Sequence, residues 1–202
     1  MIGEGSQYLK TIKVTYPAAP SSVTITPANA KSTYVTQYAM DFSSVEGLTA
    51  YVATSASAEG VTMTMVDEVP AKTPLVLVGT ANNSYEVPVI ASATTPETNL
   101  LKAGEGSNKE FDGSTYDYIL YSDGKFYQIG SGSVATTKAY LHLDAAPSNG
   151  ARTFSLIFSE TTRVNKVKAD DASGEVYNLV GERVATPQKG WYIVNGKKVI
   201  IK

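Results

Sequence analysis

Short segments in which apolar and polar residues alternate, each ended by a turn-forming residue, run through most of this chain of 202 residues. In VTMTMV (61–66), Val61, Met63 and Met65 fall on one face and the residues between them on the other, which is the two-residue period of a half-buried strand. Glycine or proline interrupts the chain about every ten residues, as is typical of an antiparallel sandwich or barrel. We therefore predict an all-β fold: an antiparallel β-sandwich with a small C-terminal β-hairpin element.

The predicted strands fall into two groups, separated by a long polar segment. The first group occupies residues 22–26, 33–40, 49–54, 61–67, 74–80 and 84–90, with turns at 55–60 and 81–83. The second group occupies residues 116–121, 125–130, 138–143 and 153–158. Asp123-Gly124 predicts a hairpin between the first two of these, because Asp and Gly tolerate a positive φ. Residues 91–115 are long for a loop, and NLLK (99–102) within them is either a helical turn or a strand.

Changes in composition divide the chain into four parts. These are a remnant or closing strand of a preceding domain at 1–18, the sandwich at 19–160, a polar linker at 161–173 and a small β tail at 174–202. Because YLKTIKVTY (8–16) alternates like the final strand of a domain, we expect the chain to be the C-terminal part of a longer protein. The tail should hold four short strands, EVYNLVG, ERVAT, GWYIVNG and KKVII, the last two joined by an Asn-Gly turn.

The terminal strands carry the only tryptophan of the chain. Trp191 and Tyr192 are neighbours in a predicted strand, so their rings should face opposite ways. One ring should pack on the body of the protein, and the other should be exposed or held by a partner. Lys197, Lys198 and Lys202 would keep this edge strand soluble, which is a usual protection against edge-to-edge pairing.

The totals exclude several classes of protein. The chain has no cysteine and a single histidine, His142, which excludes disulfides, thiolate chemistry and zinc sites built on several histidines. A formal net charge of −2 argues against nucleic-acid binding. The longest apolar runs, such as LVLV at 75–78, are far shorter than the about 20 residues of a membrane-spanning helix. We expect no cofactor, no metal, no nucleic-acid partner and no membrane span.

Candidate catalytic residues are few, and we expect no enzyme activity. His142 shares a strand face with Tyr140, and a catalytic triad would need Asp144 and a serine such as Ser133. We expect Asp144 to point to the opposite face, which leaves His142 as a surface or edge residue. Acids that could pair for glycoside hydrolysis lie in or near turns, with none marked as facing another: Asp67, Glu68, Asp112, Asp117 and Asp123. DGSTYD (112–117) lacks the oxygen spacing of an EF-hand and is interpreted as a solvated loop.

Tyrosines are more conspicuous: the chain has 13, and four surround one predicted hairpin. Aromatic rings stack on sugar faces, so Tyr116, Tyr118 and Tyr127 are the candidate residues of a glycan-binding platform. Tyrosine is also favoured in ordinary antiparallel sheets. By alternation Tyr116 and Tyr118 share one face while Tyr121 takes the other, so only part of the cluster could form a platform.

The end of the chain resembles a known export signature. EVYNLVGERV (175–184) and KGWYIVNGKKVIIK (189–202) are similar to the end of the type IX secretion sorting domain of secreted and surface proteins of Bacteroidetes. The residues that fit its two segments are Tyr177, Asn178, Leu179, Gly181 and Val184, then Pro187, Gly190, Tyr192, Ile193, Val194, Gly196, Lys197 and Lys198. In that family the tail is read by the secretion machinery. The tail corresponds to only the last part of a full sorting domain, which is a longer immunoglobulin-like sandwich.

A weaker resemblance covers residues 33–143. VPAKTPLVL (69–77) and the strands around Asp123-Gly124 are similar to a β-rich module that precedes such tails, and YLKTIKVTY resembles the closing strand of a carbohydrate-binding-like sandwich. The first ten residues lack the features of a signal peptide, so either the protein is cytoplasmic or a leader has been removed. The resemblance favours removal and an extracellular or cell-surface location.

Three hypotheses of function follow. The first is a non-catalytic module of an exported cell-surface protein, serving adhesion, spacing or attachment, with a sorting-like tail. The second is a carbohydrate-binding module that uses the tyrosine-rich hairpin. The third is an accessory or catalytic domain of a glycoside hydrolase. The expected partners are glycans, host or cell-surface proteins and, through the tail, the secretion machinery.

Overall fold

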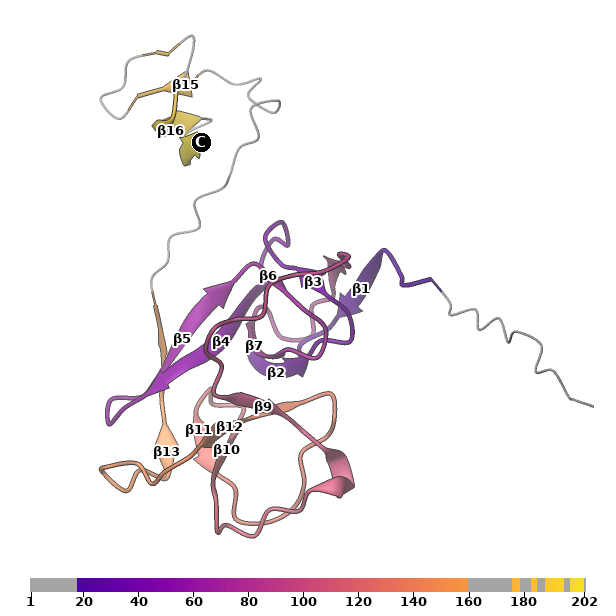
Figure 1. Cartoon of the computed structure of the whole chain (residues 1–202), viewed down its shortest axis with the longest axis vertical. Coiled ribbons are helices and arrows are strands. Elements are labelled where there is room, and N and C mark those ends of the chain that lie inside the picture. Colours follow the sequence, from indigo (N-terminus) through magenta and orange to yellow (C-terminus); the bar gives the residue numbers. More distant parts are fainter. Residues whose placement is uncertain (1–17, 160–175, 179–182, 185–187, 195–196, 202) are drawn as a thin grey trace, which may run out of the picture. The chain divides into compact units, whose positions relative to one another are not determined.

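The computed structural model describes residues 18–159, 176–178, 183–184, 188–194 and 197–201. The chain divides into two compact units, residues 1–159 and 160–202, and each is described by itself (Figure 1). The expected strand at 8–16, the expected linker at 161–173 and the tail residues Leu179, Gly181 and Gly196 lie outside the described residues. Within the described part, no helix has the length and apolar character needed to cross a membrane.

Two five-stranded sheets form most of the first unit (Figure 1). The central sheet has the order β14-β5-β4-β7-β2, with bounds Leu156–Phe158, Val61–Val66, Thr49–Ala56, Pro74–Val78 and Lys31–Val35. The second sheet has the order β13-β11-β10-β12-β9, with bounds Thr153–Phe154, Phe126–Gln128, Tyr116–Leu120, Ala139–Leu143 and Leu101–Ala103. Neighbouring strands are antiparallel except for β14, which runs parallel to β5.

One apolar core lies between these two sheets. Each sheet contributes alternate residues along its strands, because only every second side chain faces the partner sheet. Met63 of the central sheet and Tyr118, Phe126 and Leu141 of the second sheet are among its fully buried members. This packing confirms the all-β class and the antiparallel sandwich predicted from alternation.

A second core covers the other face of the central sheet. It includes residues of two small sheets, in which β1 (Ser22–Ile25) pairs with β8 (Tyr85–Pro88) and β3 (Met40–Asp41) pairs with β6 (Glu68–Val69). Strand β7 is therefore buried on both faces: Leu75 and Leu77 belong to this core and Val76 to the core between the sheets. Burial on both faces explains why LVLV is a continuous apolar run rather than an alternating one.

Two predictions in the first half of the chain need correction. The predicted strand at 33–40 is the end of β2 followed by the start of β3, because Thr36 leaves the sheet. Its N–H donates to Thr73 O at 3.1 Å and its hydroxyl to Pro70 O at 2.9 Å. The turn at 81–83 is present, but it joins strands of two different sheets, since β7 pairs with β2 and β4 whereas β8 pairs with β1.

The predicted strand at 153–158 is two short strands, β13 and β14, that belong to different sheets. Ser155 lies between them, and its carbonyl accepts a hydrogen bond from Val61 N–H at 2.9 Å. A Cβ on Gly60 would lie 2.5 Å from that carbonyl, so the crossing of the chain from one sheet to the other requires glycine there. Of the two alternatives for NLLK, the strand is correct, because β9 begins at Leu101.

The second unit contains a three-stranded sheet in the order β15-β16-β17, with bounds Val176–Tyr177, Gly190–Val194 and Lys197–Ile201. Strands β16 and β17 form the predicted C-terminal hairpin, in which Tyr192 pairs with Val199. Of the expected strand ERVAT, the described residues show one bridge, between Tyr177 and Arg183.

The aromatic neighbours of β16 face opposite ways, as predicted. Tyr192 packs against Val176, Val194 and Val199, which form the small core of this unit. Trp191 is 42% exposed, and the Lys198 ammonium lies 4.8 Å from its ring centroid. The lysine side chain thus lies over an exposed ring and places a charge on that face of the sheet.

Candidate functional site

The predicted tyrosine platform does not form one surface. Tyr118 has 0% exposure in the core between the two sheets, and Tyr116 packs against the same core. Tyr127 pairs with Ile119 and therefore lies on the other face of the second sheet. A buried ring cannot stack on a sugar, so Tyr118 is not part of an exposed platform, and the three tyrosines do not share a face.

Tyr118 supports a loop instead. Its hydroxyl donates to Ala151 O at 3.0 Å, and its ring meets Phe154 edge to face with the centroids 5.0 Å apart. Ala151 belongs to the β12–β13 loop, residues 144–152. The buried tyrosine therefore holds in place a loop that forms one wall of a pocket.

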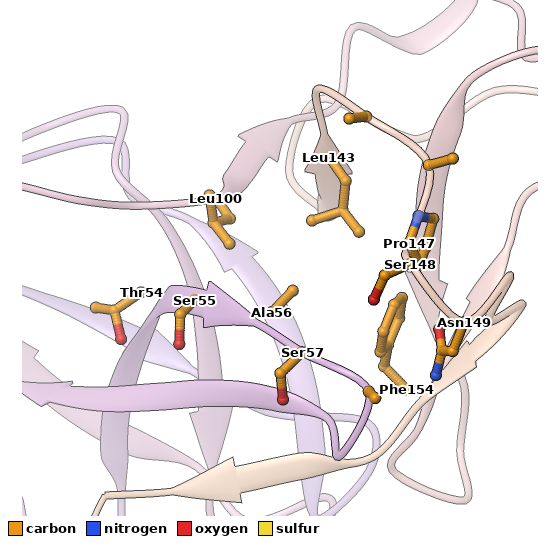
Figure 2. Close-up of a pocket in the computed structure, with 13 residues that line it drawn as sticks. Thr54, Ser55, Ala56, Ser57, Leu100, Leu143, Pro147, Ser148, Asn149 and Phe154 are labelled. Atoms are coloured by element: carbon orange, nitrogen blue, oxygen red, sulfur yellow. The ribbon is translucent and has the colours of Figure 1, made fainter.

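This pocket has a volume of about 380 Å³ and opens where the end of β4 and the β4–β5 turn face the β12–β13 loop. Figure 2 shows Ser55 and Ser57 on one side of it and Ser148 and Asn149 on the other, with Phe154 between. Serine, threonine, asparagine, alanine, proline, leucine and phenylalanine make up all 13 lining residues. The volume lies within the range of small-molecule sites, about 300–1,000 Å³.

A β-bulge shapes the β4 wall of the pocket. The register between β4 and β5 shifts between Ala53 and Ser55, so Thr54 is an additional residue in β4. Without this residue, alternation from the buried Ala53 would place Ser55 in the core. With it, Ala56 packs against the core and Ser55 stays exposed at the pocket.

The opposite wall, formed by the β12–β13 loop, is shaped by a tight turn. Gly150, at a φ of 65°, donates its N–H to Pro147 O at 2.8 Å and closes the turn. Asn149 Oδ1 accepts a hydrogen bond from Ala151 N–H at 3.0 Å. This bond uses the acceptor end of the amide and leaves the amide NH₂ of Asn149 to donate to a ligand.

The pocket combines apolar walls with neutral hydrogen-bonding groups. Leu100 and Leu143 supply apolar surface, and the hydroxyls of Ser55 and Ser148 supply donors and acceptors. The Ser57 hydroxyl is used within its own turn, because it accepts a hydrogen bond from Glu59 N–H at 3.2 Å. None of the 13 lining side chains titrates near neutral pH, so the lining offers no general acid or base. Such a lining suits a neutral ligand that is rich in hydroxyl groups.

The single histidine lies in a different and closed arrangement. His142 Nδ1 is 2.7 Å from Asp117 Oδ1, and its Nε2 is 3.3 Å from Asp144 Oδ1. The expectation that Asp144 points away is wrong, because residues two apart on a strand share a face. The Thr115 hydroxyl donates to the other oxygen of Asp117. Ser133, the serine considered for a triad, lines a separate pocket.

The polar network around Asp117 and His142 is completed by Lys109 and Tyr140. Asp117 is 1% exposed, and Lys109 Nζ lies 4.0 Å from its Oδ2. Lys109 Nζ also donates to the Tyr140 hydroxyl at 2.8 Å, and this bond is the main cause that raises the pKa of Lys109. An apolar cluster lies on the same face of the sheet and consists of Phe111, Ile129, Val134 and Tyr140. In the described part every buried side-chain polar atom has a partner, so we interpret the network as structural.

Two of the acids considered for catalysis are explained by turns. Asp112 accepts a hydrogen bond from Ser114 N–H and Asp123 accepts one from Lys125 N–H. Hydrogen bonding lowers the pKa of both carboxyl groups. The main donor is the Ser114 side chain for Asp112 and the Tyr127 hydroxyl for Asp123. Among the described residues, no three His, Asp or Glu side chains converge as metal ligands.

The sequence prediction missed every residue of the pocket. Residues 54–58 and 145–149 are small and polar or small and apolar, which is the usual composition of turns. The signal that could have drawn attention to them is the pair of turns itself, at the ends of two predicted strands. No protein-family model, curated protein or solved structure matches the chain.

Proposed function

We propose that the chain is a non-catalytic module of an exported cell-surface protein, and that it attaches to glycans through the pocket between β4 and the β12–β13 loop. The observation that carries this proposal is the lining of the pocket, in which none of the 13 residues is charged. Amide and hydroxyl groups match the hydroxyls of a neutral sugar, and apolar or aromatic side chains match its C–H faces.

The distribution of groups in the pocket supports a sugar over a wholly apolar ligand. Ser55, Ser148 and Asn149 are exposed, so their polar groups lie where a ligand enters. Leu100 and Leu143 are half-buried and offer an apolar surface that a ligand can reach. A ligand that places its hydroxyls at the exposed part and a C–H face inside would satisfy both regions.

A second candidate location keeps part of the tyrosine hypothesis. Tyr121 is 54% exposed, and its ring meets Tyr127 edge to face with the centroids 5.1 Å apart. Tyr127 is fixed by its hydrogen bond to Asp123 Oδ2 at 2.7 Å. This exposed aromatic pair, without Tyr116 and Tyr118, is the alternative contact surface for a sugar.

Export is the other part of the proposal, and the tail supports it. The resemblance to the end of a sorting domain rests in part on Tyr177, Gly190, Tyr192 and Val194, which occupy β15 and β16. A short terminal hairpin that exposes Trp191 and Lys198 is a form in which a secretion machinery could read a tail. On this proposal the protein acts outside the cell or at its surface.

Glycan binding is tested with the full chain on a glycan array, beside Ala146→Trp and Ala81→Trp. Ala146 is exposed and lines the pocket, whereas Ala81 is exposed in the β7–β8 turn, so both variants add the same ring at different places. We expect binding that is lost in Ala146→Trp and kept in Ala81→Trp. If Ala146→Trp still binds and Tyr121→Ala/Tyr127→Ala does not, the glycan site lies on the β10–β11 hairpin instead of in the pocket. No binding by a chain shown to be folded would overturn the glycan proposal.

Export is tested by placing the full chain behind a leader peptide in a Bacteroidetes host that carries the type IX system. The control is the same chain without residues 189–202. We expect the full chain at the cell surface and the shortened chain inside the envelope. Equal amounts of both at the surface would remove the sorting role of the tail.

A further inference from the structure

A second pocket lies at the other end of β12 and differs in charge from the first. It has a volume of about 420 Å³ and forms where the start of β12 and the preceding residues 133–138 face the start of β2. Leu143, at the end of β12, lines the first pocket, and Ala139, at its beginning, lines the second. Lys31 and Lys138 line the second pocket, and no acidic residue does.

The backbone fixes the wall formed by residues 133–138. Val35 N–H donates to Thr137 O at 3.1 Å, which ties this segment to β2. A Cβ on Gly104 would lie 2.2 Å from Ala135 O, so only glycine lets the two segments approach so closely. The wall is therefore formed before a ligand arrives, which lowers the entropy lost on binding.

Both lysines are placed by contacts with neutral groups. Lys138 Nζ donates to Thr33 O at 3.4 Å. The stem of Lys31 crosses Gly124, where a Cβ would lie 2.8 Å from Lys31 Cδ, and its ammonium lies 5.6 Å from the ring centroid of Phe158. Within the described part of the chain, neither ammonium group forms an ion pair.

Two lysines among the lining residues give the pocket an excess of positive charge, and an anion bound there would be attracted by both side chains. We propose that this pocket binds an oxyanion group, a carboxylate or a sulfate, through Lys31 and Lys138. The Ser133 hydroxyl and the Asn29 amide also line the pocket and supply neutral donors. The group belongs either to a small free anion or to an acidic saccharide.

A nucleic acid does not fit this pocket. Binding a phosphate backbone needs a row of cations that neutralises several phosphates. The pocket offers two lysines, and the chain as a whole has a formal net charge of −2. The inference does not rest on glycan binding by the pocket between β4 and the β12–β13 loop, because the two pockets share no lining residue.

The test is a nuclear magnetic resonance titration of the ¹⁵N-labelled full chain at constant ionic strength. The probes are sodium sulfate, glucuronate and a sulfated disaccharide, with glucose as the neutral control. We expect saturable shifts of the amide signals of residues 31–33 and 133–138 with the three anions and none with glucose. Equal affinity for sulfate and the disaccharide would identify a free-anion site, whereas tighter binding of the disaccharide would identify a saccharide site.

Variants assign the binding to the two lysines. Lys31→Gln/Lys138→Gln should weaken the affinity for the anions at least about tenfold, because a single hydrogen bond to a charged group contributes a factor of that size or more. Lys72→Gln/Lys102→Gln removes the same charge from two exposed lysines outside the pocket and should leave the affinity for the anions unchanged. Equal weakening in both variants, or wild-type shifts that do not saturate or that spread over the whole chain, would overturn the proposal. The wild-type titration decides this even if a variant fails to fold.

Discussion

The two faces of the second sheet are held by different interactions, although the same strands form both. The inner face, with Tyr118, Phe126 and Leu141, packs against the central sheet as an apolar surface. The outer face carries the Asp117–His142 contact beside a small apolar cluster to which loop residues contribute. Neighbours along β10 and β12 take opposite faces, so one residue step separates a dry core from a buried polar network.

The difference shows what each face depends on. An apolar face is stabilised in proportion to the area and volume that it buries, so losses there follow the size of the side chain removed. A buried carboxylate depends on each of its partners, because an unpaired buried polar group loses its water and gains nothing in return. The inner face therefore sets most of the stability, and the outer face fixes the loops that carry Thr115 and Lys109.

The largest loss is expected from Tyr118→Ala on the inner face. Truncation removes a fully buried ring and its hydrogen bond to Ala151, and changes of this kind cost about 3–5 kcal/mol. Urea unfolding followed by circular dichroism measures the loss. Tyr121→Ala, at a residue that is 54% exposed, should cost less than about 0.5 kcal/mol. Similar losses in the two variants would contradict the leading role of the inner face.

A smaller loss is expected from Asp117→Asn on the outer face. The substitution keeps the size of the side chain but removes the charged partner of His142, which should cost about 1–3 kcal/mol. Asp144→Asn is the matched control, because it removes the other carboxylate beside the same histidine from an exposed position. It should leave the free energy of unfolding unchanged. Equal losses would mean that burial of Asp117 does not distinguish the two contacts.

Alternation predicted the inner face but not the polar contacts of the outer one. It placed Tyr116 and Tyr118 on one face, which the packing confirms, because that pattern depends only on neighbouring residues in the sequence. The sequence prediction located Asp117 in or near a turn and marked no partner for it, because its partner is a histidine 25 positions away that only the pairing of β10 with β12 brings close. The bulge at Thr54 and the crossing at Ser155 were missed for the same reason: each depends on contact with another strand.

The pocket was unpredictable for a related reason. Its walls come from two turns that are about 90 positions apart in the sequence and that meet only because the two sheets pack together. No residue in either turn has a chemistry that marks it alone. The uncharged character of the lining is a property of the assembled site and appears only when both turns are seen together.

The smallest effect is expected at the edge of the outer face, where Tyr127 donates to Asp123 Oδ2 at 2.7 Å. This bond is the main cause that lowers the pKa of Asp123, so Tyr127→Phe should raise that pKa toward its ordinary value. A carboxyl group whose folded pKa is lowered stabilises the folded state above its unfolded pKa, and this contribution is lost as the pH falls through the folded pKa. Titration of the carboxyl carbon signals measures the change, with Asp112, whose pKa is lowered chiefly by Ser114, as the internal control. If Asp123 titrates alike in both proteins, the exposed bond does not form in solution, and the polar contacts that matter on this face are confined to the buried network.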